Sequence, residues 1–154
     1  MFLEPDADNA FLAEHVENLL RSYHTLTGKH LIEPSDNAAM LAYEAPFILL
    51  SHDGEEDPLL IYGNLAAQKL FAMDWRKLVG TPSRKTAEVP ERAERNELLR
   101  RVAEKGFIDD YSGIRIAADG RRFMIRNATV WNVSDAQGKR VGQAAAFSNW
   151  QPLD

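Results

Sequence analysis

The residues best suited to acid–base chemistry are Asp109, Asp110 and Tyr111, which are consecutive in the last third of the chain. A carboxylate beside a phenol can transfer protons once burial shifts its pKa. Adjacent residues of a strand point to opposite faces, however, so the two aspartates do not form a catalytic pair. An exposed strand, or an ion pair with Arg84 or Arg115, explains these charges without catalysis. We therefore assign no catalytic residue.

Thiol and metal chemistry is restricted by the composition, because the chain contains no cysteine. Disulfides, thiolate metal ligands and thiol nucleophiles are therefore excluded. The four histidines lack the paired spacing of a metal site, and we predict none. We expect His15, His24 and His30 to lie at the surface or to make local hydrogen bonds. His52 follows a predicted strand, beside the expected mouth of a pocket.

The segment from Arg121 to Val133 is the best candidate for a ligand-binding surface, since it is predicted to be a long strand. Regular alternation places Phe123, Ile125, Asn127, Thr129, Trp131 and Val133 on one face, and we expect Phe123 and Trp131 to contact the helices. Apolar walls with a few polar groups are typical of ligand cavities, although neighbouring side chains can equally satisfy a buried Asn or Thr. The complete candidate set is Tyr62, Asn64, Trp75, Arg84, Tyr111, Arg115, Phe123, Asn127, Thr129 and Trp131.

The orientation of Arg115 depends on the regularity of the strand that precedes this segment. A regular strand puts Arg115 on the same side as Phe107, Asp109 and Tyr111. A bulge at Gly113 would change the side on which the following residues lie. Both orientations remain open.

The elements that position these residues follow from changes in the hydrophobic period. Asn64 and Asp74 each precede an apolar segment, where their side chains can accept hydrogen bonds from the first free amides of a helix. Gly106 is well placed to end the longest helix of the core. The predicted elements are strands 46–51 and 59–62, helices 65–71 and 75–79, a loop at 81–89, a helix at 90–105, and strands 107–117, 121–133 and 139–150.

An amphipathic helix is predicted over residues 9–26. Its apolar stripe consists of Leu12, Val16, Leu19, Tyr23 and Leu26. The stripe can pack on its own domain, against the small-residue face of the last strand, or pair with a second chain. Because the stripe is long for a short sheet face, we expect a homodimer that uses this helix. We divide the chain into an N-terminal helical extension, residues 1–44, and a core, residues 45–154.

Composition and charge indicate a globular domain with an acidic surface. Charged residues make up 27% of the chain, and the net charge is −5. This charge disfavours a nucleic-acid partner, and we expect none. No segment is long and apolar enough to cross a membrane, and the acidic first ten residues resemble neither a secretory nor a transit signal. We therefore expect a cytoplasmic protein without membrane association.

The order of the predicted elements resembles the PAS fold over residues 45–150. Local matches are the strand ending at the Asn64 cap, the glycine-ended turn Leu78-Val79-Gly80 and the hairpin turn Asp119-Gly120. More narrowly, the chain resembles the MEKHLA domain, a PAS-related family. That resemblance rests on Tyr62-Gly63-Asn64, Asp74-Trp75, Thr81-Pro82-Ser83-Arg84, the runs 106–111 and 128–132, and Gly142-Gln143-Ala144 with Phe147 and Trp150.

The resemblance implies an α+β fold, in which helices cover one face of a PAS-like five-stranded antiparallel sheet and the N-terminal helix packs on the other. It also implies a sensor or regulatory module that binds a small molecule or protein partner without catalysis and signals through oligomerisation. PAS domains that bind flavin photochemically or carry a covalent chromophore use a cysteine, so both are excluded. Haem-binding members often use a histidine of the longest helix, which has none here. Haem is not expected, and the ligand stays unknown.

Two other functions remain open. A small α+β-barrel enzyme of the isomerase or dehydratase type would use Asp109 or Asp110 with Tyr111. Strand order separates this alternative from a PAS domain, because the PAS sheet places its first and last strands together in its middle. A protein-interaction domain with a filled core is the other alternative. A cavity beside the polar residues of 121–133 would count against it.

Overall fold

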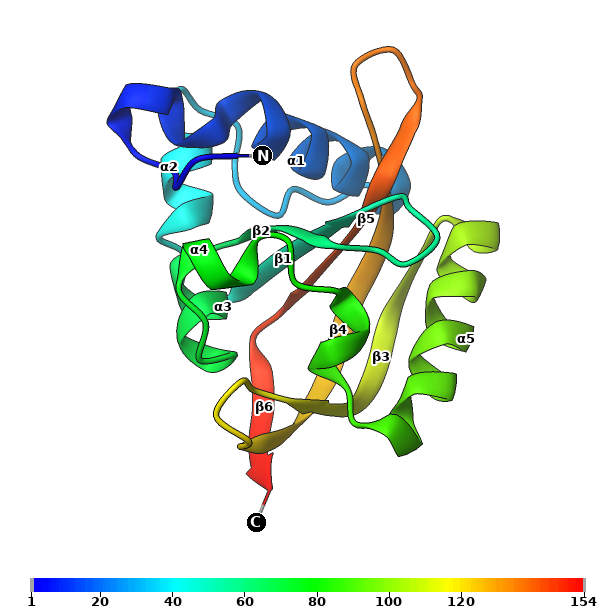
Figure 1. Cartoon of the computed structure of the whole chain (residues 1–154). Helices are drawn as coiled ribbons and strands as arrows, with labels where there is room; N and C mark the ends of the chain where they lie inside the picture. Colours follow the sequence, from blue (N-terminus) through cyan, green and yellow to red (C-terminus); the bar gives the residue numbers. More distant parts are fainter. Residues whose placement is uncertain (1, 154) are drawn as a thin grey trace.

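The computed structural model describes residues 2–153 and is organised around one antiparallel sheet of six strands (Figure 1). The strands are β1 Ile48–Asp53, β2 Leu60–Gly63, β3 Phe107–Ile116, β4 Arg122–Ser134, β5 Arg140–Phe147 and β6 Asn149–Leu153. Their order is β2-β1-β5-β4-β3, with β6 paired to β4. The first strand therefore lies beside the strand of the closing segment in the middle of the sheet, which confirms the PAS-like order.

The sheet has one strand more than the sequence indicated. A single last strand was predicted over 139–150, but it ends at Phe147 and the chain starts β6 at Asn149. Because β4 has 13 residues, it can pair with β5 along 129–134 and with β6 along 122–126. The break between β5 and β6 thus falls opposite Asn127.

The helical elements confirm most of the predicted boundaries in the core. The helices are α1 Ala13–Thr27, α2 Ala38–Tyr43, α3 Leu65–Leu70, α4 Trp75–Leu78 and α5 Val89–Lys105, and the short 3₁₀ segments are Ala7–Leu12 and Ser83–Thr86. The side chains of Asn64 and Asp74 cap α3 and α4 by accepting the backbone amides of Ala67 and Lys77. The segment 81–89, predicted as a loop, contains the second 3₁₀ segment.

Helix α1 begins later than predicted, at Ala13 instead of residue 9. Ala10, Phe11 and Leu12 have φ angles of 54°, 54° and 56°, which are left-handed and interrupt the helix. The helix ends as predicted near Gly28, whose φ of 76° permits a left-handed cap.

The apolar stripe of α1 packs on the chain's own sheet. Val16 and Leu19 are fully buried, while Leu12, Tyr23 and Leu26 are half-buried against the same core. The indole N–H of Trp131 on β4 donates to the carbonyl of Leu19 at 3.1 Å. The stripe therefore packs inside the chain, with Leu12, Tyr23 and Leu26 left partly exposed, and the expected homodimer stays a prediction.

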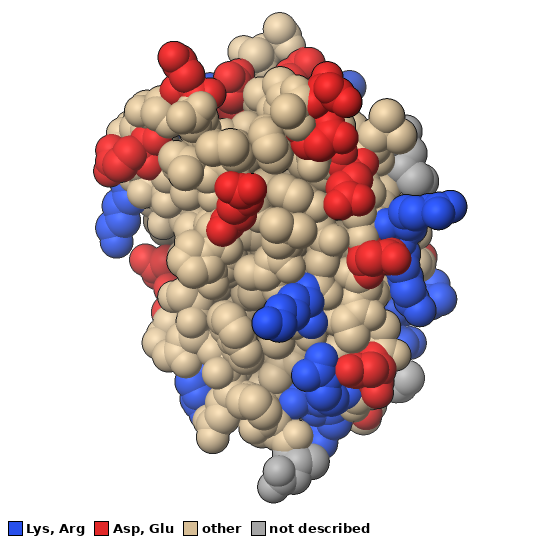
Figure 2. All heavy atoms as spheres, turned by 90° about the vertical axis from the view of Figure 1, so that its left-hand side faces the viewer, with Lys and Arg blue, Asp and Glu red and all other residues tan. Residues whose placement is uncertain are grey.

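The opposite face of the sheet is covered by α5, which contacts β3 and β4 and lies beside β3 in Figure 1. Leu98 and Val102 of α5 are buried against Val130 of β4. None of the helices among residues 2–153 is long and apolar enough to cross a membrane. Figure 2 shows the side of the molecule that carries α2, α3 and α4, with acidic side chains mainly in its upper part and basic ones below.

The side chains of β4 do not alternate regularly between the two faces of the sheet. Tyr111 pairs with Ala128 and Gly113 pairs with Ile125, so β4 carries one extra residue at this point. The extra residue is accommodated at Asn127, which is exposed and has a φ of 53°, a conformation that asparagine tolerates better than most residues. Ala128 therefore continues the α5 face of Ile125, whereas Trp131 faces α1.

Candidate ligand-binding site

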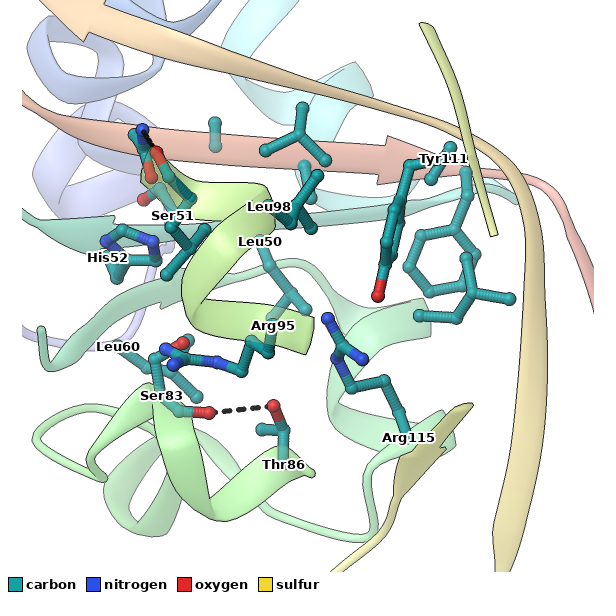
Figure 3. Close-up of a pocket in the computed structure, with 18 of the residues that line it drawn as sticks. Leu50, Ser51, His52, Leu60, Ser83, Thr86, Arg95, Leu98, Tyr111 and Arg115 are labelled. Carbon is teal, nitrogen blue, oxygen red and sulfur yellow. Dashed lines mark hydrogen bonds between the residues drawn. The ribbon is translucent and has the colours of Figure 1, made fainter. Parts of the chain in front are cut away.

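A cavity of about 80 Å³ lies between α5 and the sheet, as the close-up in Figure 3 shows. Its apolar walls include Leu50, Leu60, Phe71, Leu98, Ile125 and Phe147. Its polar lining includes Ser83, Thr86, Arg95, Tyr111, Arg115 and Gln143. Apolar walls with a few converging polar groups are the usual composition of a small-molecule site.

Arg95 reaches the cavity from α5 and is only 3% exposed. One guanidinium nitrogen, Nη1, donates to the side chain of Asn96 at 2.9 Å. The other, Nη2, is buried and has no hydrogen-bond partner among the described residues. Burial, followed by the nearby charge of Arg115, lowers the pKa of Arg95 to about 10.

Arg115 lines the same cavity from β3 and is 7% exposed. Its Nη1 donates to the carbonyl of Ile114 at 2.8 Å, and its guanidinium carbon lies 5.4 Å from the centre of the Tyr111 ring. In Figure 3 the guanidinium and the Tyr111 hydroxyl point toward one another. The open question of its orientation is thus answered: Arg115 faces the cavity.

Tyr111 is held against the cavity by the absence of a side chain at Gly113. A Cβ atom at Gly113 would lie 2.1 Å from the Tyr111 hydroxyl oxygen, so only glycine leaves room for the phenol. That hydroxyl is buried and has no hydrogen-bond partner within residues 2–153. Burial raises the pKa of Tyr111.

The two buried guanidinium groups have no carboxylate counterion in the part of the chain that the structure describes. The carboxylates that form ion pairs bind other arginines, as Asp57 does with Arg84 at 3.2 Å on the surface. A buried charge without a partner is costly unless another group compensates it. Together with the Tyr111 hydroxyl, the cavity therefore offers hydrogen-bond donors and positive charge to a bound molecule.

The cavity adjoins an open surface pocket beside the loop between β1 and β2. His52, Arg95, Leu99 and Gln143 line both spaces. The Gln143 side chain is held by donating to the carbonyl of Leu99 at 3.0 Å and to Asn132 at 3.1 Å. Burial lowers the pKa of His52, which makes the neutral imidazole the favoured form there. These four residues therefore lie between the surface pocket and the cavity.

The sheet order and the helix α5 that covers one face are those of a PAS-like fold. The model of the MEKHLA domain family matches residues 13–152. The chain belongs to the MEKHLA domain family. The match spans both the N-terminal helix and the sheet. No curated protein is similar enough in sequence to match this MEKHLA domain.

Solved structures similar to this MEKHLA domain are PAS and light-oxygen-voltage domains. A PAS domain from Colwellia psychrerythraea has a TM-score of 0.61 and 13% identity, with 75% of this chain and 92% of that one covered. A light-oxygen-voltage domain studied with a flavin analogue has a TM-score of 0.56 and 15% identity, with coverages of 78% and 86%. An RNA-binding light-oxygen-voltage receptor has a TM-score of 0.56 and 17% identity, and the 75% of this chain that aligns spans 31% of it. These similarities establish the fold.

A flavin does not fit the site of this MEKHLA domain. The sequence has no cysteine to form a thiol adduct. The cavity of about 80 Å³ is also far below the roughly 300–1,000 Å³ of pockets for drug-sized ligands. In the described residues, no group of three or more histidine, aspartate and glutamate side chains is positioned to hold a metal ion.

The structure brings together only part of the candidate set derived from the sequence. Tyr111 and Arg115 line the cavity, and Phe123 packs edge-on against Phe71 at its wall. The other members lie elsewhere. Arg84 is at the surface, Asn127 is exposed, and Thr129 and Trp131 belong to the α1 face because of the bulge at Asn127. The prediction of one shared face for 123–131 was therefore wrong.

Tyr62, Asn64 and Trp75 stabilise the contact between the core and the N-terminal segment. The rings of Tyr62 and Trp75 meet edge to face at 5.7 Å, and His15 of α1 lies 5.7 Å from Tyr62. Asn64 is fully buried, and its side chain makes hydrogen bonds to four backbone groups. None of the three lines the cavity beneath α5.

Arg95 is the functional residue that the sequence reasoning missed. It lies three residues before Leu98 and seven before Val102, which places it on the apolar face of α5. An arginine on the buried side of a helix that is otherwise solvated was the signal that could have identified it.

The structure does not place the carboxylates of the acid–base alternative in the cavity. Asp109 and Asp110 are both exposed, and neither lines the cavity with Tyr111. One extra residue of β3 between Ile108 and Tyr111 separates them from the phenol and turns Phe107 toward the α1 face.

Proposed function

We propose that this MEKHLA domain is a sensor module that binds a small molecule in the cavity beneath α5, without converting it, and transmits binding through α1. The observation that carries this proposal is a cavity lined by two buried polar groups without partners within the described residues, Arg95 Nη2 and the Tyr111 hydroxyl. Folded proteins satisfy nearly all such groups, so their collection in one cavity favours a bound molecule.

Strand β1 supplies a route from the cavity to α1. Leu50 and His52 line the cavity on one side of the strand. The hydroxyl of Ser51, between them in sequence, lies 3.0 Å from Nε2 of His15 on α1. A shift of β1 on ligand binding would therefore displace the Ser51 hydroxyl and change its contact with His15 of α1 on the opposite face.

Signalling through a homodimer is the second part of the proposal. Since the apolar stripe is used inside the chain, a partner would contact the exposed side of α1, which carries Glu14, Glu17, Arg21 and His24. Light scattering of the intact chain and of Glu17→Arg tests this: a dimer weakened by the substitution supports it, and a monomer at high concentration contradicts it. We also expect the module to act in the cytoplasm.

Native mass spectrometry of protein purified without denaturation tests ligand binding. We expect an added mass of a small molecule on the wild-type chain. The substitution Ala128→Leu fills the cavity from β4 and should abolish the added mass. Ala118→Leu, at an exposed residue of the turn between β3 and β4, is the matched control and should retain it.

The alternative of an interaction domain with a filled core is favoured by one observation, the small volume of the cavity. It predicts bare protein in the mass spectrum. It also predicts that Ala128→Leu lowers the free energy of unfolding, because a filled core has no space for the larger side chain.

A further inference from the structure

We propose that the ligand is a small organic carboxylate, whose carboxylate group binds Arg95 and Arg115 while its apolar body lies against Phe71 and Ile125. This inference rests on the proposed function of the cavity as a binding site. It adds the chemical class of the ligand.

The first argument is charge. Arg95 and Arg115 line one cavity, are 3% and 7% exposed, and have no carboxylate partner within residues 2–153. Desolvating two guanidinium groups in one cavity is unfavourable, because each loses its hydration and the two charges repel each other. A bound anion restores the missing interaction for both groups, whereas a cation or a neutral apolar molecule does not.

The second argument is hydrogen bonding. Guanidinium groups have donors and no acceptor, and a carboxylate has acceptors and no donor. Arg95 Nη2 and the Tyr111 hydroxyl are buried without partners in the described chain, and Arg115 donates only to its own strand, at the carbonyl of Ile114. A carboxylate can accept from all three groups, and charge-assisted bonds of this type are short and strong.

The third argument is the size and polarity of the remaining space. Leu50, Phe71, Leu98, Ile125 and Phe147 form walls that suit an apolar body. A cavity of about 150 Å³ holds benzene, so a space of about 80 Å³ admits a short aliphatic chain in preference to a large ring system. A highly polar polyanion would leave most of its acceptors against apolar walls.

We expect an anion to reach the cavity from the adjoining surface pocket. Arg95 lines both the pocket and the cavity, and Arg100 and Arg140 also line the pocket. Asp53, Glu55 and Glu56 lie there too, so the pocket is of mixed charge. Arg95 is therefore the positively charged residue that lines both the surface pocket and the cavity.

The test is thermal unfolding of the full chain with acetate, butyrate, hexanoate and benzoate, beside the neutral isostere butyramide, butylammonium and inorganic phosphate. We expect a carboxylate of this series to raise Tm by about 4 °C at tenfold excess over its Kd. Butyramide and butylammonium should give no shift. The carboxylate assignment is overturned if phosphate alone raises Tm. It is also overturned if no carboxylate of the series raises Tm.

Variants locate the effect. Arg95→Met and Arg115→Met should each weaken carboxylate binding about tenfold or more, because a charge-assisted contact is lost. Arg84→Met is the matched control, since Arg84 is at the surface, and it should bind normally. Circular dichroism confirms that each variant is folded. Unchanged binding by both folded cavity variants contradicts the inference.

The same measurements separate this inference from the function on which it rests. A neutral molecule retained in native mass spectrometry, with no carboxylate binding, refutes the ligand class and leaves the sensor function intact. Bare protein that binds no compound of either kind refutes both.

Discussion

The imidazole Nε2 of His15 lies 3.0 Å from the hydroxyl oxygen of Ser51. This contact joins the middle of α1 to β1, the strand whose other side lines the cavity. Burial lowers the pKa of His15 to about 4, so the imidazole is neutral in the folded protein near pH 7. The link between helix and strand therefore depends on a histidine that resists protonation.

Acid should destabilise the fold through His15. The His15 imidazole binds a proton near pH 6.5 in the unfolded state and only near pH 4 in the folded state, so its contribution to stability is constant above about pH 6.5 and is lost as the pH falls toward 4. We expect this group to contribute a loss of about 3 kcal/mol across that range. Urea unfolding as a function of pH measures it, and His15→Gln should reduce the slope. An unchanged slope in His15→Gln contradicts the assignment.

Trp131 should be among the largest single contributors to stability on the α1 face. Its ring is fully buried, lies 5.0 Å from the Tyr23 ring and donates to the carbonyl of Leu19. Because it does not line the cavity, Trp131→Ala should cost about 3–5 kcal/mol of unfolding free energy. Chemical denaturation measures the loss. Trp150→Ala, at a half-buried position, should cost less, and equal losses would place the two rings in similar surroundings.

Asn64 should matter far more than an ordinary helix cap. Its Oδ1 accepts the amides of Leu49 and Ala67, and its Nδ2 donates to the carbonyls of Ala42 and Phe47. Asn64→Ala leaves several buried backbone groups without partners and should cost at least about 3 kcal/mol.

The exposed cap Asp74 is the matched control for Asn64. Asp74→Ala should cost only about 1 kcal/mol, since its lost bond to Lys77 is replaced by water. Equal losses for the two alanine variants in denaturant unfolding contradict a structural role for the additional Asn64 bonds.

Removing a buried charge should stabilise the ligand-free protein. Arg95→Met keeps much of the side-chain volume and removes a guanidinium that is 3% exposed and has an unpartnered Nη2 within the described residues. We expect an increase in unfolding free energy of about 1 kcal/mol or more, measured on protein stripped of bound molecules. A marked loss of stability would show that Arg95 is compensated within the protein.

The strand order and the caps could be predicted from the sequence because local signals specify them. Hydrophobic runs, the Asn64 and Asp74 caps and the glycine turns each depend on nearby residues. The α1 stripe was recognised for the same reason. Its burial against the sheet could not be separated from a dimer seam, since both need the same spacing.

The site was harder to predict because it depends on two bulges. One extra residue in β3 and one at Asn127 in β4 reverse the facing of the residues that follow. A one-residue shift moves every side chain to the opposite face of the sheet. Thr129 and Trp131 were therefore placed on the wrong side, while Arg95 was missed because charged residues on helices are usually solvated.

A crystal structure of the protein purified without denaturation is the most direct test of ligand binding beneath α5. We predict density for a non-protein molecule in the cavity, with an acceptor atom about 2.7–3.2 Å from a guanidinium nitrogen of Arg95 or Arg115. A cavity closed by side chains or holding only water, in protein that carries no small molecule by mass spectrometry, would contradict a sensor function for this cavity.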